Sequence, residues 1–202
     1  VISPHIKIIG NRAFNNCKQL KKVDIPSSSE LEIIGSNAFS SSDISKIYIP
    51  PHLIKIGDGA FTNCLKLKKV DIPEISDLQM IGKLSFQNTP IRYLYIPIHV
   101  KLIDDRAFEK CNKLRYVEIS SNSELQQINK FAFSNSSIAK IFIPDQLKKL
   151  CFGAFNKCHE LNGVVFTPNS EIQTISNLAL DFIGIKSLYI PPKLINLKKH
   201  WC

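Results

Sequence analysis

The amino-acid sequence repeats itself with a period of 47 residues. Each period contains the motif Ala-Phe-x-x-Cys followed by a Leu-x-x-Val-x-Ile-like segment. A variant copy of the motif lies between successive copies. The position of the motif's Phe therefore recurs at alternating intervals of 25 and 22 residues. A regular period of this length is typical of solenoid proteins, in which repeats stack on one another. The repeating positions are Phe14, Phe61, Phe108 and Phe155 with Cys17, Cys64, Cys111 and Cys158, and the variant copies carry Phe39, Phe86, Phe133 and Leu180.

Each repeat of 22–25 residues has three parts. The first is apolar and ends at a residue that tolerates a left-handed backbone, which predicts a turn with a positive φ. The second, around Ala-Phe, is expected to form a short helix or 3₁₀ helix. The third alternates and is rich in β-branched residues, which predicts a strand that stops at the following proline. The predicted positive-φ positions are Gly10, Gly35, Gly57, Gly82, Asp104 and Asn129.

One such repeat cannot bury its own apolar face, whereas stacked repeats share a continuous core. The leucine spacing and the period are those of leucine-rich repeats. We therefore expect an α/β solenoid, a leucine-rich repeat horseshoe of about eight repeats, with one parallel β-sheet on its concave face. Residues 1–202 are expected to form a single domain. Because the chain starts partway into a repeat and its last repeat is incomplete, we expect it to be a fragment of a longer protein.

The full motif, Ile-Gly-x-x-Ala-Phe-x-x-Cys-x-x-Leu-x-x-Val-x-Ile-Pro, resembles the BspA-like leucine-rich repeats, also called the Treponema pallidum type. The resemblance covers residues 6–191. It implies a protein of a bacterial or protozoan cell surface, with adhesion to host or matrix proteins in some members. Local departures include Leu180 in place of Phe and Ser120 in place of the strand-ending Pro.

The net charge of +9 arises from 26 Lys and Arg against 17 Asp and Glu. Such a balance attracts anionic partners, but it is equally the charge of a solvated, lysine-rich surface. No apolar run reaches the roughly 20 residues needed to cross a bilayer. Residues 1–10 lack the features of a signal peptide.

The cysteines in the repeating column are predicted to be reduced. Equivalent cysteines lie two repeats apart, about 10 Å along the stack, whereas a disulfide needs Cα atoms within about 7 Å. The same distance excludes a shared zinc ion. We expect a column of buried thiols, with Ser42, Thr89 and Ser136 at the equivalent sites between them. Cys151 and Cys202 lie outside this column and are candidates for free thiols.

No motif predicts catalysis, a cofactor or a metal site. His5, His52 and His99 also repeat at 47 residues, but we identify no second ligand repeating beside them, so we interpret them as a product of the repeat. The adjacent acids Asp104 and Asp105 are interpreted as solvated turn residues. The protein is therefore expected to be non-enzymatic.

The outward-facing strand residues form the candidate binding site. Period-two alternation points the residues before and after each central Val away from the core. One interpretation is cross-strand pairing, worth about 0.2–1 kcal/mol per pair. The other is a binding face, because exposed tyrosines near arginines are typical of interface hot spots, and solenoids bind on their concave surface. The candidate residues are Lys46, Tyr48, Lys69, Asp71, Tyr93, Tyr95, Tyr116, Glu118, Lys140 and Phe142.

We therefore expect a monomeric interaction or adhesion module that binds a protein, such as a host or extracellular-matrix protein, or a glycan. Nucleic acid is not expected, because Asp24, Asp71 and Glu118 lie in the same groove and repel phosphate. A cell-surface or secreted location follows from the resemblance alone. An intracellular scaffold in the cytoplasm, or a structural stalk, is the alternative, since reduced cysteines suit a reducing compartment equally well.

Overall fold

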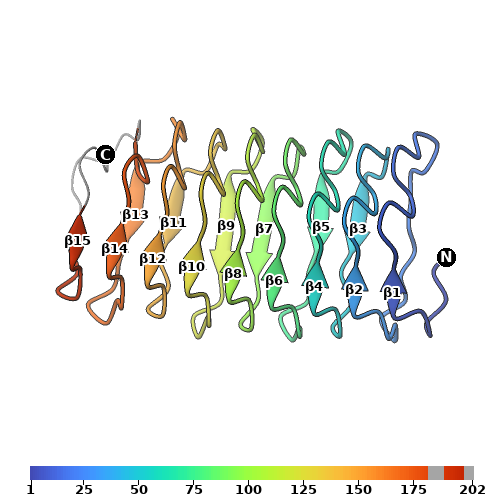
Figure 1. Ribbon diagram of the computed structural model, residues 1–202, viewed down its shortest axis with the longest axis horizontal. Coiled ribbons are helices and arrows are strands. Elements are labelled where there is room, and N and C mark those ends of the chain that lie inside the picture. Colours follow the sequence, from blue (N-terminus) through green and yellow to red (C-terminus); the bar gives the residue numbers. More distant parts are fainter. Residues whose placement is uncertain (182–188, 198–202) are drawn as a thin grey trace.

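The computed structural model describes residues 1–181 and 189–197. The chain winds into a solenoid whose turns lie side by side along the long axis of the molecule, from β1 to β15 (Figure 1). The parallel-strand leucine-rich repeat solenoid is thus confirmed. The short helix expected around each Ala-Phe is not found, because the described residues form strands and turns and no helix.

One row of the solenoid is a nine-stranded parallel sheet of two-residue strands. Partner residues in adjacent strands lie alternately 25 and 22 positions apart, as the pairs Ile8↔Ile33 and Ile33↔Lys55 illustrate. These strands occupy the apolar segment that the sequence analysis assigned to a turn. They are β1 (Ile8–Ile9), β2 (Ile33–Ile34), β4 (Lys55–Ile56), β6 (Met80–Ile81), β8 (Leu102–Ile103), β10 (Gln127–Ile128), β12 (Lys149–Leu150), β14 (Thr174–Ile175) and β15 (Asn196–Leu197).

The Leu-x-x-Val-x-Ile segments form a second row of parallel strands. This row is divided into a two-stranded and a four-stranded sheet, so the single sheet predicted for these segments is interrupted between β5 and β7. The first such segment, residues 20–25, contains no strand, and most of the last, residues 185–190, lies outside the described residues. The strands are β3 (Lys46–Tyr48), β5 (Lys69–Asp71), β7 (Tyr93–Ile96), β9 (Tyr116–Ile119), β11 (Lys140–Phe142) and β13 (Gly163–Val165).

Hydrogen bonds between coils take the place of the expected helix. The backbone N–H of Phe61 donates to the carbonyl of Ser85 at 2.7 Å, and that of Phe86 donates to the carbonyl of Ala107 at 2.8 Å. Within a coil, the N–H of Ala60 closes a turn by donating to Gly57 at 3.2 Å. An α-helix needs each N–H to bond the carbonyl four residues earlier. These groups are already used between coils, so the segment forms turns.

The positive-φ prediction for the recurrent glycine is wrong. None of the predicted positions has a positive φ: Gly10, Gly35, Gly57, Gly82, Asp104 and Asn129. Each of these positions is instead followed by two left-handed residues, two and six positions later, as at Gly59, where φ is 62°, and Asn63, where φ is 57°. Gly57 is needed for a different reason, since a Cβ there would lie 2.7 Å from the carbonyl carbon of Gly35 in the preceding coil. The recurrent glycine thus permits close stacking of the coils.

A column of stacked phenylalanine rings runs through the core. Neighbouring rings have centroids 5.0–5.3 Å apart and interplanar angles of 2–12°. This spacing is close to the separation of about 4.8 Å between hydrogen-bonded strands, so the backbone ladder places each ring against the next. All of the rings after the first are completely buried. The column consists of Phe14, Phe39, Phe61, Phe86, Phe108, Phe133 and Phe155.

Phe108→Ala is expected to lower the free energy of unfolding by about 3–5 kcal/mol, because it leaves a cavity between the rings of Phe86 and Phe133. Urea unfolding followed by circular dichroism measures this loss. Phe108→Leu is the matched control and should cost less, since Leu180 is completely buried at the equivalent position. A loss below about 1 kcal/mol for the alanine variant would contradict a central role for the column.

Candidate partner-binding site

The ten predicted binding residues lie together on one surface, on the outer sides of β3, β5, β7, β9 and β11. Each strand has a buried central residue with more exposed neighbours on either side, and none of the ten is buried. Tyr116 and Phe142 expose 62% and 58% of their surface. We call this surface the aromatic–acidic face, defined by Lys46, Tyr48, Lys69, Asp71, Tyr93, Tyr95, Tyr116, Glu118, Lys140 and Phe142.

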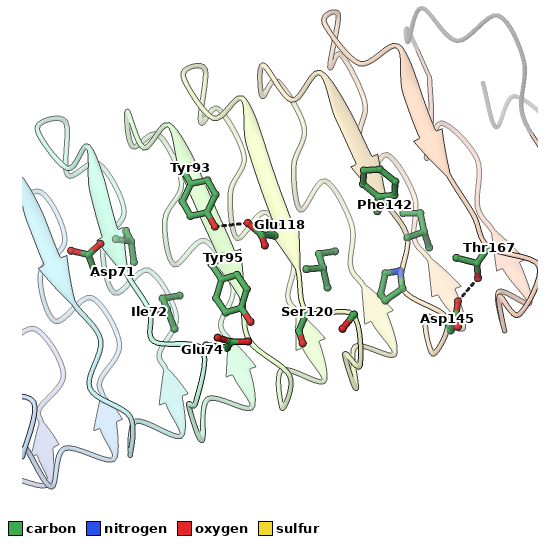
Figure 2. Close-up of a pocket in the computed structure, with 15 residues that line it drawn as sticks. Asp71, Ile72, Glu74, Tyr93, Tyr95, Glu118, Ser120, Phe142, Asp145 and Thr167 are labelled. Atoms are coloured by element: carbon green, nitrogen blue, oxygen red, sulfur yellow. Dashed lines mark hydrogen bonds between the residues drawn. The ribbon is translucent and has the colours of Figure 1, made fainter.

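A cleft of about 720 Å³ opens on this face (Figure 2). Its size falls within the roughly 300–1,000 Å³ typical of ligand pockets. Half of the predicted residues line it, namely Asp71, Tyr93, Tyr95, Glu118 and Phe142. The other half lie on the same face but outside the cleft, namely Lys46, Tyr48, Lys69, Tyr116 and Lys140.

The cleft also contains residues that the sequence analysis did not select. Glu74 and Asp145 each follow a strand-ending proline and lie in a loop. Their counterparts 47 residues away are not acidic, as Ser121 shows for Glu74, so the period carries no signal for them. An acid that appears in only one period, at a position that is not acidic in the others, could have identified Glu74 and Asp145 as candidate site residues. The remaining additions are Val70, Ile72, Ile119, Ser120, Ser121, Ile143, Pro144 and Thr167.

The cleft opens where pairing between the strands is incomplete. β7 and β9 pair along their full length, from Tyr93↔Tyr116 to Ile96↔Ile119. By contrast, β9 and β11 pair only at Tyr116↔Lys140, and β5 and β7 belong to different sheets. The carboxyl-terminal ends of β9 and β11 are therefore not joined. Glu118 and Phe142 line the cleft from these two neighbouring strands (Figure 2).

The cleft is acidic although the protein as a whole is basic. Its lining includes the carboxylates of Asp71, Glu74, Glu118 and Asp145 and no basic side chain. Lys69, outside the cleft, places its Nζ 2.8 Å from Asp71. The other three carboxylates form no ion pair with any residue that the structure describes. A negative potential is thus concentrated at the carboxyl-terminal ends of these strands.

Hydroxyl groups orient two of these carboxylates. The hydroxyl of Tyr93 donates to Oε2 of Glu118 at 2.7 Å, and the hydroxyl of Thr167 donates to Asp145 (Figure 2). Burial, followed by the hydrogen bond to Glu118 and its charge, raises the pKa of Tyr93 to about 12. The phenol therefore remains a neutral donor at physiological pH, and it fixes Glu118 without cancelling its charge.

Glu118→Gln is expected to lower the pKa of Tyr93 from about 12 toward 10.0, because it removes the neighbouring charge. Ultraviolet titration of tyrosinate measures this shift, and Tyr93→Phe identifies the transition that belongs to Tyr93. A titration unchanged by Glu118→Gln would contradict the contact.

The raised pKa also has a consequence for stability. A phenol whose pKa is raised on folding binds its proton more tightly in the native state than in the unfolded state. Its contribution to stability is therefore complete below pH 10.0 and is lost as the pH rises through about 12. Tyr93→Phe should remove this component of the alkaline loss of stability.

The buried thiol column is confirmed for three of its four predicted cysteines, and the burial predicted for Cys17 is wrong. Each thiol donates to a phenylalanine carbonyl in the preceding coil at 3.0–3.2 Å, and each lies 3.2–3.5 Å from a hydroxyl. Burial raises the pKa of Cys111 and Cys158 to about 11 and also raises that of Cys64. The thiols involved are Cys64, Cys111 and Cys158, and the hydroxyls are those of Ser42, Thr89 and Ser136.

The remaining cysteines differ in their environments. Cys17, in the first repeat, is partly exposed, whereas Cys151 is buried, and both are free thiols. Burial raises the pKa of Cys151, which disfavours the reactive thiolate. Cys202 lies outside the described residues.

The histidine column has a repeating partner that the sequence analysis overlooked. Each Nδ1 lies 3.0–3.2 Å from a carboxylate 25 residues later. The statement that no second group repeats beside these histidines is therefore wrong. Each pair supplies only two groups, and the described residues contain no cluster of three or more potential metal ligands. The pairs are His5 with Glu30, His52 with Asp77, and His99 with Glu124.

The adjacent acids lie at a turn, as predicted, but they are only partly exposed and they bond to the next coil. Asp104 accepts a hydrogen bond from the Asn129 side chain at 2.7 Å, and Asp105 accepts one from the backbone N–H of Lys130 at 3.0 Å. Asp58, one period earlier, accepts the equivalent backbone bond from Lys83 at 3.0 Å. These acids therefore join consecutive coils.

Three solved structures share the fold. A leucine-rich repeat protein from Bacteroides ovatus has a TM-score of 0.65 and 20% identity over 98% of this chain and 67% of its own. The pneumococcal vaccine antigen PcpA has a TM-score of 0.61 and 24% identity, covering 97% and 57%. A leucine-rich cell surface protein from Faecalibacterium prausnitzii has a TM-score of 0.50 and 21% identity, covering 94% and 65%. The chain thus spans between 57% and 67% of these relatives.

Comparison with curated proteins returns no match. None of the described residues belongs to a helix that could span a membrane. The family model of the BspA type leucine rich repeat region matches in six copies, over residues 1–115 and 79–201. This family and fold are typical of protein-interaction modules rather than of enzymes. Because the match extends over nearly the whole sequence, the chain belongs to the BspA-type leucine-rich repeat family.

Proposed function

We propose that this protein is a non-enzymatic adhesion module of a cell surface, and that it binds a protein partner on its aromatic–acidic face. The observation that carries the proposal is the group of exposed aromatic side chains around one cleft. Tyr93, Tyr116 and Phe142 expose 46%, 62% and 58% of their surface on adjacent strands. Exposed aromatic clusters on a rigid surface are typical of interface hot spots.

The rigid backbone supports this use. β7 and β9 pair along their full length, and their central residues Leu94 and Val117 are buried in the core. The side chains that point outward therefore project from a fixed frame, and little conformational entropy is lost when a partner binds. Arg92 and Arg115 lie exposed beside Tyr93 and Tyr116 in the sequence, and arginine is also enriched at interfaces.

The charge of the cleft distinguishes among classes of partner. A nucleic acid would bring its phosphates toward Asp71, Glu74, Glu118 and Asp145, which repel them. A glycan could stack on the aromatic rings and donate its hydroxyls to the carboxylates, but a neutral sugar would leave the negative charges unpaired. A protein segment can supply both apolar groups and cations, and it therefore matches the cleft most completely.

The cell-surface part of the proposal is supported by the family and by the names of two structural relatives, a cell surface protein and a vaccine antigen. An intracellular scaffold is the competing location. The reduced cysteine column is compatible with either compartment, because its thiols are buried and protonated.

Tyr95→Ala/Phe142→Ala is expected to weaken binding of the partner by about thirtyfold, as expected when a hot-spot contact worth about 2 kcal/mol is removed. Purified host-surface proteins, matrix proteins and glycans are immobilised, and binding of the chain is measured by biolayer interferometry. Tyr95 and Phe142 both line the cleft.

Leu65→Ala/Ile8→Ala is the matched control, because it removes exposed apolar groups outside the face. It should leave affinity unchanged. Equal binding by the cleft variant and the control would place the site elsewhere. Binding confined to glycans would replace the protein partner with a carbohydrate.

Antibodies against the solenoid are expected to label intact cells of the producing organism, because an adhesion module must face outward. Fluorescence of intact and permeabilised cells provides the comparison, with a cytoplasmic protein as the negative control. Labelling only after permeabilisation would favour the intracellular scaffold over the adhesion module.

A further inference from the structure

In the first two 47-residue periods, the outward-facing acid of the strand segment forms an ion pair with a lysine of the chain itself. In the first 47-residue period, Lys22 places its Nζ 2.8 Å from the carboxylate of Asp24. In the second period, Lys69 lies 2.8 Å from Asp71. In both cases the lysine precedes the acid by two residues, so the two side chains lie on the same side of the strand segment. The solenoid thus neutralises these acids from within.

The third period breaks this arrangement. Tyr116 occupies the position of Lys22 and Lys69, and Glu118 occupies the position of their acids. Glu118 has no ion-pair partner among the described residues and accepts a hydrogen bond from the hydroxyl of Tyr93 at 2.7 Å. A neutral phenol orients the carboxylate but leaves its charge uncompensated. The third period therefore keeps the acid of the ion pair, as Glu118, but has a tyrosine, Tyr116, where the earlier periods have the lysine.

Two other carboxylates of the cleft also lack an ion pair with any described residue. Asp145 is held by the hydroxyl of Thr167, again a neutral donor. Glu74 lines the cleft without an ion pair to a described residue. A carboxylate has two oxygens that accept hydrogen bonds, so Glu118 and Asp145 each keep one for a ligand. Unlike Asp24 and Asp71, these three acids form no ion pair with a described lysine or arginine. Lys140, on the neighbouring strand, instead places its Nζ over the ring of Phe142, 4.6 Å from the ring centroid.

We propose that the cleft binds lysine or arginine side chains from an extended segment of the partner protein, and that one ligand cation pairs with Glu118 as Lys69 pairs with Asp71. This proposal rests on the proposed function and adds the chemical class of the partner. The rings of Tyr93 and Tyr95 line the same cleft. They provide apolar surface for the aliphatic stem of the ligand and an attractive face for its charge.

A substitution in the chain itself separates this idea from a purely aromatic site. Tyr116→Lys restores the internal cation of the earlier periods, and its ammonium group should occupy Glu118. Tyr116→Ala removes the same ring without adding a cation. Charge-driven recognition therefore predicts a large difference between the two variants, whereas aromatic recognition alone predicts that both behave alike.

The probe is a fluorescent, end-capped octapeptide of alternating lysine and serine, and its binding to the full chain is followed by fluorescence anisotropy at low salt. The wild-type chain is expected to bind it, and raising the salt concentration should weaken binding through charge screening. Tyr116→Lys should bind at least about tenfold more weakly than Tyr116→Ala. Glu118→Gln/Asp145→Asn should weaken binding similarly, because it removes the charges while the amide oxygens still accept the two hydroxyl donors.

Two controls match the change in net charge. Leu65→Lys adds a positive charge at an exposed position outside the face, and Asp24→Asn/Glu160→Gln removes two negative charges outside the cleft. Both should bind the peptide like the wild type. Circular dichroism of every variant confirms that the solenoid is folded.

The proposal is overturned if the lysine peptide does not bind the wild type, if a glutamate–serine peptide binds equally well, or if Tyr116→Lys and Tyr116→Ala bind alike. In those cases, loss of partner binding in Tyr95→Ala/Phe142→Ala would still support the proposed function. Retained partner binding in that variant would instead contradict the proposed function, whatever the peptide does.

Discussion

The hydrogen-bonded ladder between successive coils is the constraint on which this structure depends. It runs along the short strands of the nine-stranded sheet and through the Ala-Phe turns, where Phe61 donates to Ser85 of the next coil. It therefore fixes the distance between coils at about the spacing of strands in a sheet. That distance brings the phenylalanine rings to centroid separations of 5.0–5.3 Å. It also brings the backbone of the preceding coil so close to Gly57 that a Cβ there would lie 2.7 Å from the carbonyl carbon of Gly35.

A fixed distance between coils turns each sequence position into a column, and an outward column can be altered while the buried residues of its strands are kept. The outward columns show this best. Lys69 and Asp71 form an ion pair, whereas Tyr116 and Glu118 at the equivalent positions do not, although both strands keep a buried central residue. The core thus supplies the shape of the surface, and single outward substitutions supply its chemistry. A binding site on such a scaffold is best recognised where a column departs from its own pattern.

The period predicted the features that depend on stacking alone: the parallel solenoid, the alternation of 25 and 22 residues and the buried thiols. It did not predict where the left-handed residues lie, because a recurrent glycine is compatible with either a positive φ or a close approach, and only the backbone of the next coil decides between them. The cleft was predicted in part. Asp71, Tyr93 and Phe142 belong to periodic strand positions, whereas Glu74 and Asp145 lie in loops outside the period. The divergence of β9 from β11 also depends on pairing, which the local sequence does not determine.

The contrast between the net charge of +9 and the acidic cleft follows from the same organisation. Total charge governs attraction at long range, but a bound partner meets the few groups within a Debye length of about 10 Å. In the N-terminal periods, Lys22 and Lys69 neutralise their acids at 2.8 Å, so those acids add little to the local potential. At Glu118 the neutralising position is occupied by Tyr116, and the local potential becomes negative. In the proposed recognition of a ligand cation, one substitution in a lysine column therefore reverses the kind of ligand that this part of a basic solenoid attracts, while the strand keeps its buried central residue.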